Sequence, residues 1–412
     1  MSDEETPEIN PMHRIPHFDR LTHRSPGRVV LFCAALLAST TALAGAAADA
    51  SDTRYVSARL PILGRSVELG ANRPAGLSPA ASTMAPAGRP ANTWTKLANL
   101  PNAVVHDVAF ADATTGYAAA EEGQIWQTTN GGQAWTEILN RGYPYYYYGI
   151  YVTGKKVVAS GFDDSNSEAI LSQSNDGGKT WGADTVLGTN AWAGRVRFTH
   201  GLGHGLAMSG EGLADPNAAW STIKPNQWTQ NTPDPGGGWF GYQFTLLKDQ
   251  TAYASGINYC KSADTGATWT CGPPADSVFD GPTEFVSDKI GWTGGGEISP
   301  DVAGWLHRTT DGGTKWSGRV LNAPWPIREI TFLSKTIGWA AGGNIYSGVG
   351  GIYYSADGGK TWALDTNTGD EVGSCADEVI GDGSQTQIWC IGDAYNGSSF
   401  SSNVYSTVVA TP

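Results

Sequence analysis

The segment Ser-Ala-Asp-Gly-Gly-Lys-Thr-Trp at residues 355–362 decides the fold of this 412-residue chain, because variants of it recur. Each copy begins with Ser or Thr, continues with Asp or Asn and then Gly at fixed positions, and ends with Trp. Neighbouring tryptophans lie about 46 residues apart, or once about twice that distance, and a period of this size indicates a repeat architecture of the propeller type. The copies occupy residues 128–135, 174–181, 262–269, 309–316 and 355–362.

Two degenerate copies bring the number of Trp-bearing strands to seven. Ser221 and Trp228 keep the spacing of the repeat without its Asp and Gly, and Trp94 lies one period before Trp135. A second phrase, such as Gly-Trp-Ala-Ala-Gly at residues 338–342, also occurs seven times, but none precedes Trp94 and no Trp strand follows the last. We therefore predict an all-β, seven-bladed propeller of four-stranded antiparallel blades. The strand near Trp94 joins the C-terminal blade and closes the ring, which hides the sheet edges.

The repeated segment is predicted to form the hairpin turn between the third and fourth strands of each blade. Asp and Ser or Thr side chains accept hydrogen bonds from turn amides, glycine supplies positive φ, and the Trp ring covers the turn. We interpret these aspartates as turn-forming residues. The alternative is contact with a metal ion or another ligand.

Composition argues against two kinds of partner. The chain has 54 Gly, 16 Trp and 16 Tyr, which suits short strands, tight turns and aromatic cover. Charged residues make up only 16% of the chain, and its formal net charge is -13. A chain of this sign repels phosphate backbones and anionic lipids, so nucleic acid is not predicted as a partner, nor an anionic membrane as the main one.

The N-terminus has the pattern of an export signal. An apolar run at residues 29–43 follows Arg24 and Arg28 and precedes a stretch of small residues. This order is typical of a Sec-type signal, which we assign to residues 1–48. An uncleaved membrane anchor is the alternative, although the apolar run is short for a membrane span.

A linker is predicted between this signal and the folded domain. Residues 49–91 are rich in Ala, Pro, Gly, Ser and Arg and have no sustained period, as flexible linkers do. The propeller is predicted to occupy residues 92–412. Export would place it in the periplasm or outside the cell, or in the thylakoid lumen of a photosynthetic source.

Export would also place the cysteines of the propeller in an oxidising compartment. Cys260 and Cys271 flank one copy of the repeat, and Cys375 and Cys390 begin and end another predicted strand pair. We favour disulfides within these two pairs over the two other connectivities. A zinc site is the competing interpretation, although no C-x-x-C pair is present.

The connections from each Trp strand to the next inner strand are rich in aromatic residues. They are predicted to share the face of the ring opposite the repeated turns. Aromatic side chains on Gly- and Pro-rich turns are poorly placed to fill a core, and exposed aromatic groups mark binding surfaces. The alternative is that the rings fold over the mouth of the central channel. With two nearby arginines, the predicted binding residues are Tyr145, Tyr147, Trp192, Arg195, Trp239, Phe240, Trp325 and Arg328.

Charged residues at the starts of the predicted inner strands could line the same mouth. Two carboxylates at a suitable separation across such a funnel could hydrolyse a glycoside. The alternative is that these charges are solvated or paired with one another. No catalytic residue and no metal ligand is assigned. The further charged residues considered are Asp107, Arg197, Glu284, Glu329, Asp377 and Glu378.

The repeats match the Asp-box, or bacterial neuraminidase repeat, of sialidases, sortilin-type receptors and many secreted propellers. Within that group, residues 309–316 and 332–342 resemble most the photosystem II stability and assembly factor-like propellers. The resemblance covers residues 92–412 and implies an exported, non-enzymatic scaffold that binds other polypeptides. Photosynthetic members of that family bind through a basic patch, and no comparable concentration of basic residues occurs in this sequence.

We therefore predict an exported, non-enzymatic propeller that acts as a protein-binding or assembly scaffold, with an exported or membrane protein as partner. The alternative is a carbohydrate-binding or sialidase-like glycoside hydrolase propeller with a glycan ligand, because an aromatic-rimmed concave face also suits sugars. Sialidases carry Arg-Ile-Pro ahead of their first Asp-box. Here that motif, residues 14–16, precedes the export segment and is interpreted as coincidence. No cofactor is predicted, since the sequence has no phosphate-binding loop, zinc-protease motif or nucleophile elbow.

Overall fold

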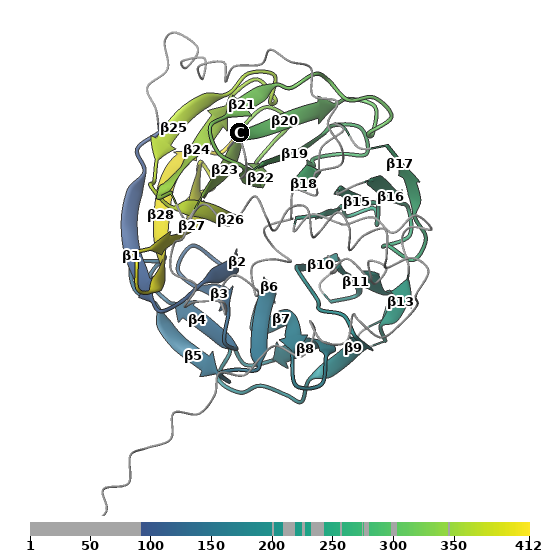
Figure 1. The fold of residues 1–412 in the computed structure, drawn as a ribbon, viewed down its shortest axis with the longest axis vertical. Coiled ribbons are helices and arrows are strands. Elements are labelled where there is room, and N and C mark those ends of the chain that lie inside the picture. Colours follow the sequence, from purple (N-terminus) through teal and green to yellow (C-terminus); the bar gives the residue numbers. More distant parts are fainter. Residues whose placement is uncertain are drawn as a thin grey trace, which may run out of the picture. The chain divides into compact units, whose positions relative to one another are not determined.

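The computed structural model consists of seven four-stranded antiparallel sheets arranged in a ring (Figure 1). All described residues belong to the compact unit Leu60–Pro412. The predicted signal and linker, residues 1–91, lie outside the described part of the chain. Within that part, no helix is long and apolar enough to cross a membrane. The described residues are 92–199, 202–208, 219–224, 227–231, 243–255, 258–273, 275, 280–297, 303–344 and 347–412.

Blades 1 to 6 each run in chain order from an inner strand to an outer strand (Figure 1). Blade 1 contains β2 (Val105–Phe110), β3 (Gly116–Ala120), β4 (Gln124–Thr128) and β5 (Thr136–Asn140). Blade 2 contains β6 (Tyr145–Thr153), β7 (Lys156–Asp163), β8 (Glu168–Ser174) and β9 (Thr185–Thr189). Blade 3 contains β10 (Val196–Thr199), β11 (His204–Met208), β12 (Ala219–Thr222) and β13 (Thr229–Asn231).

The second half of the ring follows the same order. Blade 4 contains β14 (Thr245–Leu246), β15 (Ala252–Ser255), β16 (Tyr259–Ser262) and β17 (Thr270–Gly272). Blade 5 contains β18 (Asp280–Phe285), β19 (Gly291–Glu297), β20 (Ala303–Thr309) and β21 (Leu321–Ala323). Blade 6 contains β22 (Ile327–Phe332), β23 (Gly338–Asn344), β24 (Val349–Ser355) and β25 (Ala363–Asn367).

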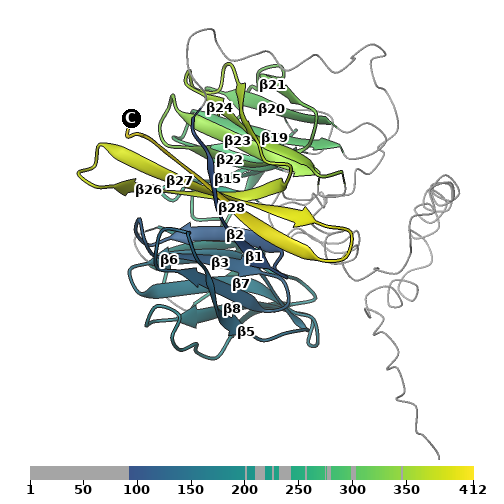
Figure 2. The same ribbon diagram turned by 90° about the vertical axis from the view of Figure 1, so that its left-hand side faces the viewer.

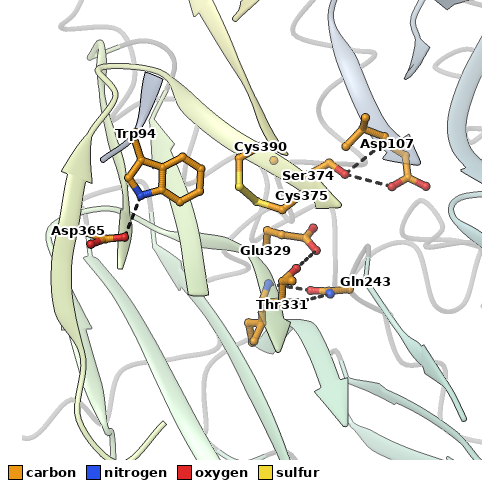
Figure 3. Close-up of a disulfide and its surroundings, with 12 residues drawn as sticks. Trp94, Asp107, Gln243, Glu329, Thr331, Asp365, Ser374, Cys375 and Cys390 are labelled. Carbon is orange, nitrogen blue, oxygen red and sulfur yellow. Dashed lines mark hydrogen bonds between the residues drawn. A yellow bond between two sulfur atoms is a disulfide. The ribbon is translucent and has the colours of Figure 1, made fainter. Parts of the chain in front are cut away.

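Blade 7 is built from both ends of the propeller and closes the ring as the sequence predicts. From the centre outward, its first three strands are β26 (Glu371–Ile380), β27 (Gln385–Tyr395) and β28 (Phe400–Ala410), drawn in yellow in Figure 2. The outer strand is β1 (Thr95–Pro101), which pairs antiparallel with β28. Asn92 and the indole N–H of Trp94 also donate hydrogen bonds to Asp365 of blade 6, and Figure 3 shows the bond from Trp94. The first residues of the propeller therefore contact both blade 7 and blade 6.

The repeated segment forms the turn between the third and fourth strands. In the copy at residues 355–362, the Gly359 amide donates to the Ser355 hydroxyl (2.8 Å) and the Thr361 amide donates to the Asp357 carboxylate (3.0 Å). The indole N–H of Trp362 donates to the Gly359 carbonyl (3.2 Å). The two amide bonds recur in the other four copies. The acidic or amide side chain of the motif therefore closes a local turn.

Aromatic side chains join each blade to the next. The ring of Trp292 on β19 stacks on Phe332 of blade 6 at 3.5 Å, and its indole N–H donates to the Gly358 carbonyl in the turn of that blade (3.2 Å). Trp362 meets the same Phe332 edge-on. Trp389, Phe110 and Trp135 repeat this arrangement between blades 7 and 1, where Trp389 donates to the Gly131 carbonyl. The core therefore lies between blades, which explains the aromatic residue in copies of the second repeated phrase such as those of Trp292 and Trp389.

The two predicted disulfides are present. Cys260 on β16 lies directly opposite Cys271 on β17, and Cys375 on β26 lies opposite Cys390 on β27. In both pairs the Cα atoms are 4.1 Å apart and the sulfur atoms are bonded. Figure 3 shows the Cys375–Cys390 bond. Each bond ties two neighbouring strands of one blade, and none of these sulfurs is free to bind zinc.

Candidate functional site

A β-bulge recurs near the start of the inner strands. In blade 1, Val105 faces Ala120 and Asp107 faces Ala119, which leaves His106 as an extra residue between them. Bulges redirect side chains and are common beside functional sites. The corresponding extra residues are Tyr148 in blade 2, Arg328 in blade 6 and Gly373 in blade 7.

The residues next to these bulges form an ionic network across the centre of the ring. Arg195, which precedes β10, donates to Glu329 on β22 (2.6 Å) and to the Gly373 carbonyl (2.9 Å). Its Nε lies 3.4 Å from Asp107 on β2. Arg197 donates a second bond to Asp107 (2.9 Å). Asp107, Arg195 and Glu329 are 0%, 4% and 3% exposed, so this network ties blades 1, 3, 6 and 7 together away from water.

The arginines keep Asp107 ionised in this network, whereas burial raises the pKa of Glu329 despite Arg195. Burial opposes ionisation of Asp107, but Arg197 and Arg195 outweigh it and hold the pKa of Asp107 below its ordinary value. Burial likewise opposes the charge on Arg195, while Glu329 and Asp107 raise the pKa of Arg195. The Ser374 hydroxyl donates a further bond to Asp107 (3.1 Å), as Figure 3 shows. The interpretation as paired charges therefore holds for these residues, and Arg195 is enclosed rather than presented to a ligand.

Two other carboxyl groups of the inner strands hold their protons more tightly than usual. Burial and the negative charge of Glu329 raise the pKa of Glu284 to about 8, and the Thr245 hydroxyl donates to Glu284 (3.2 Å). Asp377 touches solvent, yet the protein around it removes enough water to raise the pKa of Asp377 to about 6. Asp377 contributes to the shift of Glu284, so the two groups lie within electrostatic reach of each other.

Four aromatic side chains, from blade 1, blade 2 and the connection between blades 2 and 3, gather beside the network. The rings of His106 and Tyr148 lie 5.0 Å apart, and Tyr148 meets Trp192 edge-on at 5.1 Å. Tyr146 lies parallel to Tyr148 with ring centroids 6.3 Å apart. Tyr146, Tyr148 and Trp192 are partly exposed, whereas the side chain of His106 is only 9% exposed. We call His106, Tyr146, Tyr148 and Trp192 the aromatic cluster.

Carboxylates border the aromatic cluster. Glu121 lies 3.3 Å from the His106 ring nitrogen, and the neighbouring Glu122 is exposed. Asp164 accepts a hydrogen bond from the exposed Tyr143 hydroxyl (3.1 Å). Burial, and then the charges of Asp164, Glu121 and Glu122, raise the pKa of Tyr146. We call Glu121, Glu122 and Asp164 the acidic rim; the cluster therefore sits in a negative field.

The predicted aromatic residues are only partly brought together. Trp192 belongs to the aromatic cluster, and Tyr145 is partly exposed beneath the Arg141 guanidinium, 4.9 Å from its ring centroid. Tyr147 is 0% exposed, lies in the core between blades 1 and 2 and bonds with the Ser172 hydroxyl (2.8 Å). The expectation of an exposed ring was wrong for Tyr147, because it begins the β6 bulge on the buried face of the strand.

Trp325 is a second correction. It is 6% exposed and packs in the core between blades 5 and 6, near Tyr353 and over Gly351, where a larger residue would meet its ring. Trp325 therefore lies in the core between blades, a position that neither the predicted exposed ring nor its alternative, a ring over the mouth of the channel, describes. Arg328 is partly buried, with its Nε 3.3 Å from Glu371. Trp239 and Phe240 lie outside the described residues.

Sequence reasoning missed His106, Tyr146 and Tyr148. Tyrosines 145 and 147 were chosen from a run of four, and strand alternation alone does not say which pair faces outward. The bulge after Tyr147 decides it, and nothing in the run marks that bulge. For His106, the available signal was its position directly before Asp107. His106 in blade 1 is equivalent to Tyr148 in blade 2.

Comparison with known proteins supports the architecture. No protein-family model and no curated protein sequence matches the chain. The solved structure of YCF48 from Cyanidioschyzon merolae has a TM-score of 0.54 at 15% identity, over 76% of this chain and 98% of that one. YCF48 bound to D1 peptide gives 0.55 at 16% identity, over 77% and 98%. The GH74 xyloglucanase from Xanthomonas campestris gives 0.52 at 14% identity, over 73% and 53%. Identities this low show the fold alone.

Among the described residues, no three His, Cys, Asp or Glu side chains gather in a way that could hold a metal ion.

Proposed function

We propose that this chain is an exported, non-enzymatic scaffold that holds another polypeptide on the aromatic cluster. The observation that carries the proposal is a group of three partly exposed rings, Tyr146 and Tyr148 on β6 and Trp192 in the connection between blades 2 and 3, which packs on His106 of blade 1 beside the inner network. Large aromatic groups on a fixed support supply contact area at low entropic cost, which is typical of protein-binding hot spots. The similarity in fold to YCF48, solved with a bound D1 peptide, is compatible with a peptide on such a ring.

Export is supported by the two disulfides. Structural disulfides persist in oxidising compartments and are rare where thiols are kept reduced. The periplasm and the exterior of the cell both meet this condition. The partner is therefore proposed to be another exported protein or the exported part of a membrane protein.

Glycan binding or hydrolysis is the competing function, and the ionic network weakens the case for hydrolysis. A retaining or inverting glycosidase needs two carboxyl groups free to act on substrate. Asp107 and Glu329 are instead buried and paired with Arg195. Glu284 has the raised pKa of a general acid, which is the observation that favours hydrolysis.

The test is selection of peptides from a displayed library on the full chain, followed by titration against Trp192→Ala and Tyr148→Ala. Each variant should weaken the selected peptide by roughly thirtyfold, the size of a hot-spot truncation. Tyr395→Ala, at an exposed ring of blade 7, is the matched control and should leave affinity unchanged. Equal affinity in all three variants would contradict the proposed surface. Binding on a glycan array, with no peptide selected, would favour the carbohydrate function.

A further inference from the structure

The rings of the aromatic cluster do not all lie in parallel planes. Tyr148 and Trp192 meet at 60°, while Tyr146 lies parallel to Tyr148. Aromatic faces carry negative potential, and a cation within about 6 Å of a ring centroid is attracted to them. Rings at an angle can contact one cation on more than one side, whereas a sugar ring stacks on a single flat face.

The acidic rim places negative charge beside the aromatic cluster, which a positively charged ligand would complement. Asp164, Glu121 and Glu122 lie close enough to Tyr146 to disfavour its ionisation. His106 is the basic group that contacts Glu121, and it carries a full charge only when protonated. The chain as a whole has a formal charge of -13. A positively charged partner would therefore be favoured at both short and long range.

The same strand already shows how a cation is held in this region. The Arg141 guanidinium lies 4.9 Å from the ring centroid of Tyr145 and bonds with Asp184 at 2.5 Å. One aromatic face and one carboxylate thus bind a guanidinium supplied by the chain itself. Tyr146, next along β6, also has a carboxylate within electrostatic reach, since the charge of Asp164 helps to raise the pKa of Tyr146.

We propose that the partner segment is basic, and that one of its arginine or lysine side chains docks against Tyr146, Tyr148 and Trp192 beside the acidic rim. This inference rests on the proposed function, since it names the chemistry of the polypeptide that the scaffold holds. Because Glu122 is exposed, part of the attraction is screened by salt, and affinity falls as ionic strength rises. Arginine suits the site better than lysine, since its planar group both stacks on rings and bonds with a carboxylate.

The test uses fluorescently labelled synthetic 12-residue peptides of Gly, Ser and four arginines, titrated into the full chain. Matched peptides carry citrulline, which keeps the shape of arginine without its charge, or glutamate in place of arginine. The arginine peptide should bind at least about tenfold more tightly than either. A rim variant, Glu121→Gln with Glu122→Gln and Asp164→Asn, should lose about the same factor.

A charge-matched control separates the site from general attraction. Glu137→Gln, Asp288→Asn and Asp382→Asn together remove three charges from exposed positions elsewhere and should leave the affinity within about twofold. Equal loss in this control and in the rim variant would overturn the inference, as would equal binding of the citrulline peptide. If the glutamate peptide binds best and still depends on Trp192, the inference fails while the scaffold function stands. If no peptide binds, the inference fails, and the library selection decides the scaffold function separately.

Discussion

Arg195 is the residue on which the centre of the propeller depends most. It contacts two buried acids, Asp107 of blade 1 and Glu329 of blade 6. A buried ion pair adds little net stability compared with apolar residues of the same size, but removing one partner leaves the other charge buried without compensation. The network therefore specifies how blades 1, 3 and 6 meet.

Replacement of Arg195 by Met should lower the free energy of unfolding by about 3 to 5 kcal/mol, because Asp107 and Glu329 lose their common partner. Urea unfolding followed by tryptophan fluorescence measures the change. Lys335→Met, at an exposed position, is the control and should have an effect of at most about 0.5 kcal/mol. Adding Glu329→Gln to Arg195→Met should recover part of the loss. A single variant as stable as its control would show that the network is not as buried as described.

At this scale the sequence predicted kinds of residue better than individual ones. It indicated aromatic residues near blades 2 and 3, and Trp192 is in the aromatic cluster. It chose Tyr145 and Tyr147 where the structure places Tyr146 and Tyr148, since one inserted residue changes the face on which side chains lie. Local patterns do not reveal such a bulge, which depends on the partner strand.

At the scale of the element, the repeated turn was predictable because its interactions are local. The residues that close it lie within eight positions of one another, so spacing alone identified it. The contacts of the turn with the next blade were not predictable. Gly359 lies at φ 71° against Trp292 of blade 5, and no local rule reports that neighbour.

Gly359→Ala should destabilise the propeller for two reasons. An added Cβ would lie 2.1 Å from the Trp292 indole nitrogen, and the residue would keep a positive φ. We expect a loss of at least about 1 to 3 kcal/mol, measured as a lower midpoint in urea. Gly318→Ala, where an added Cβ would meet nothing within 4 Å, is the matched control. Equal midpoints for the two variants would contradict the packing of the turn against blade 5.

At the scale of the whole molecule, seven blades and their closure were predictable from two repeated phrases that each occur seven times. The first Trp strand has no copy of the second phrase before it, and the last copy of the second phrase has no Trp strand after it. The aromatic cluster was less accessible, because it depends on which side chains of blade 1, blade 2 and the connection before blade 3 meet. Sequence order separates His106 from Trp192, and only the ring brings them to the same cluster. The proposed scaffold function requires this ring to be closed and rigid.

The most direct test of the account is thermal unfolding of two shortened chains, one beginning at Asn92 and one at Asn102. The second lacks β1 and the contacts of Asn92 and Trp94 with Asp365, so β28 becomes an open edge. We predict that the first chain melts in one cooperative transition and that the second melts at least roughly 10 °C lower or without cooperativity. Melting of both chains at the same temperature, within about 2 °C, would contradict closure of the ring by β1.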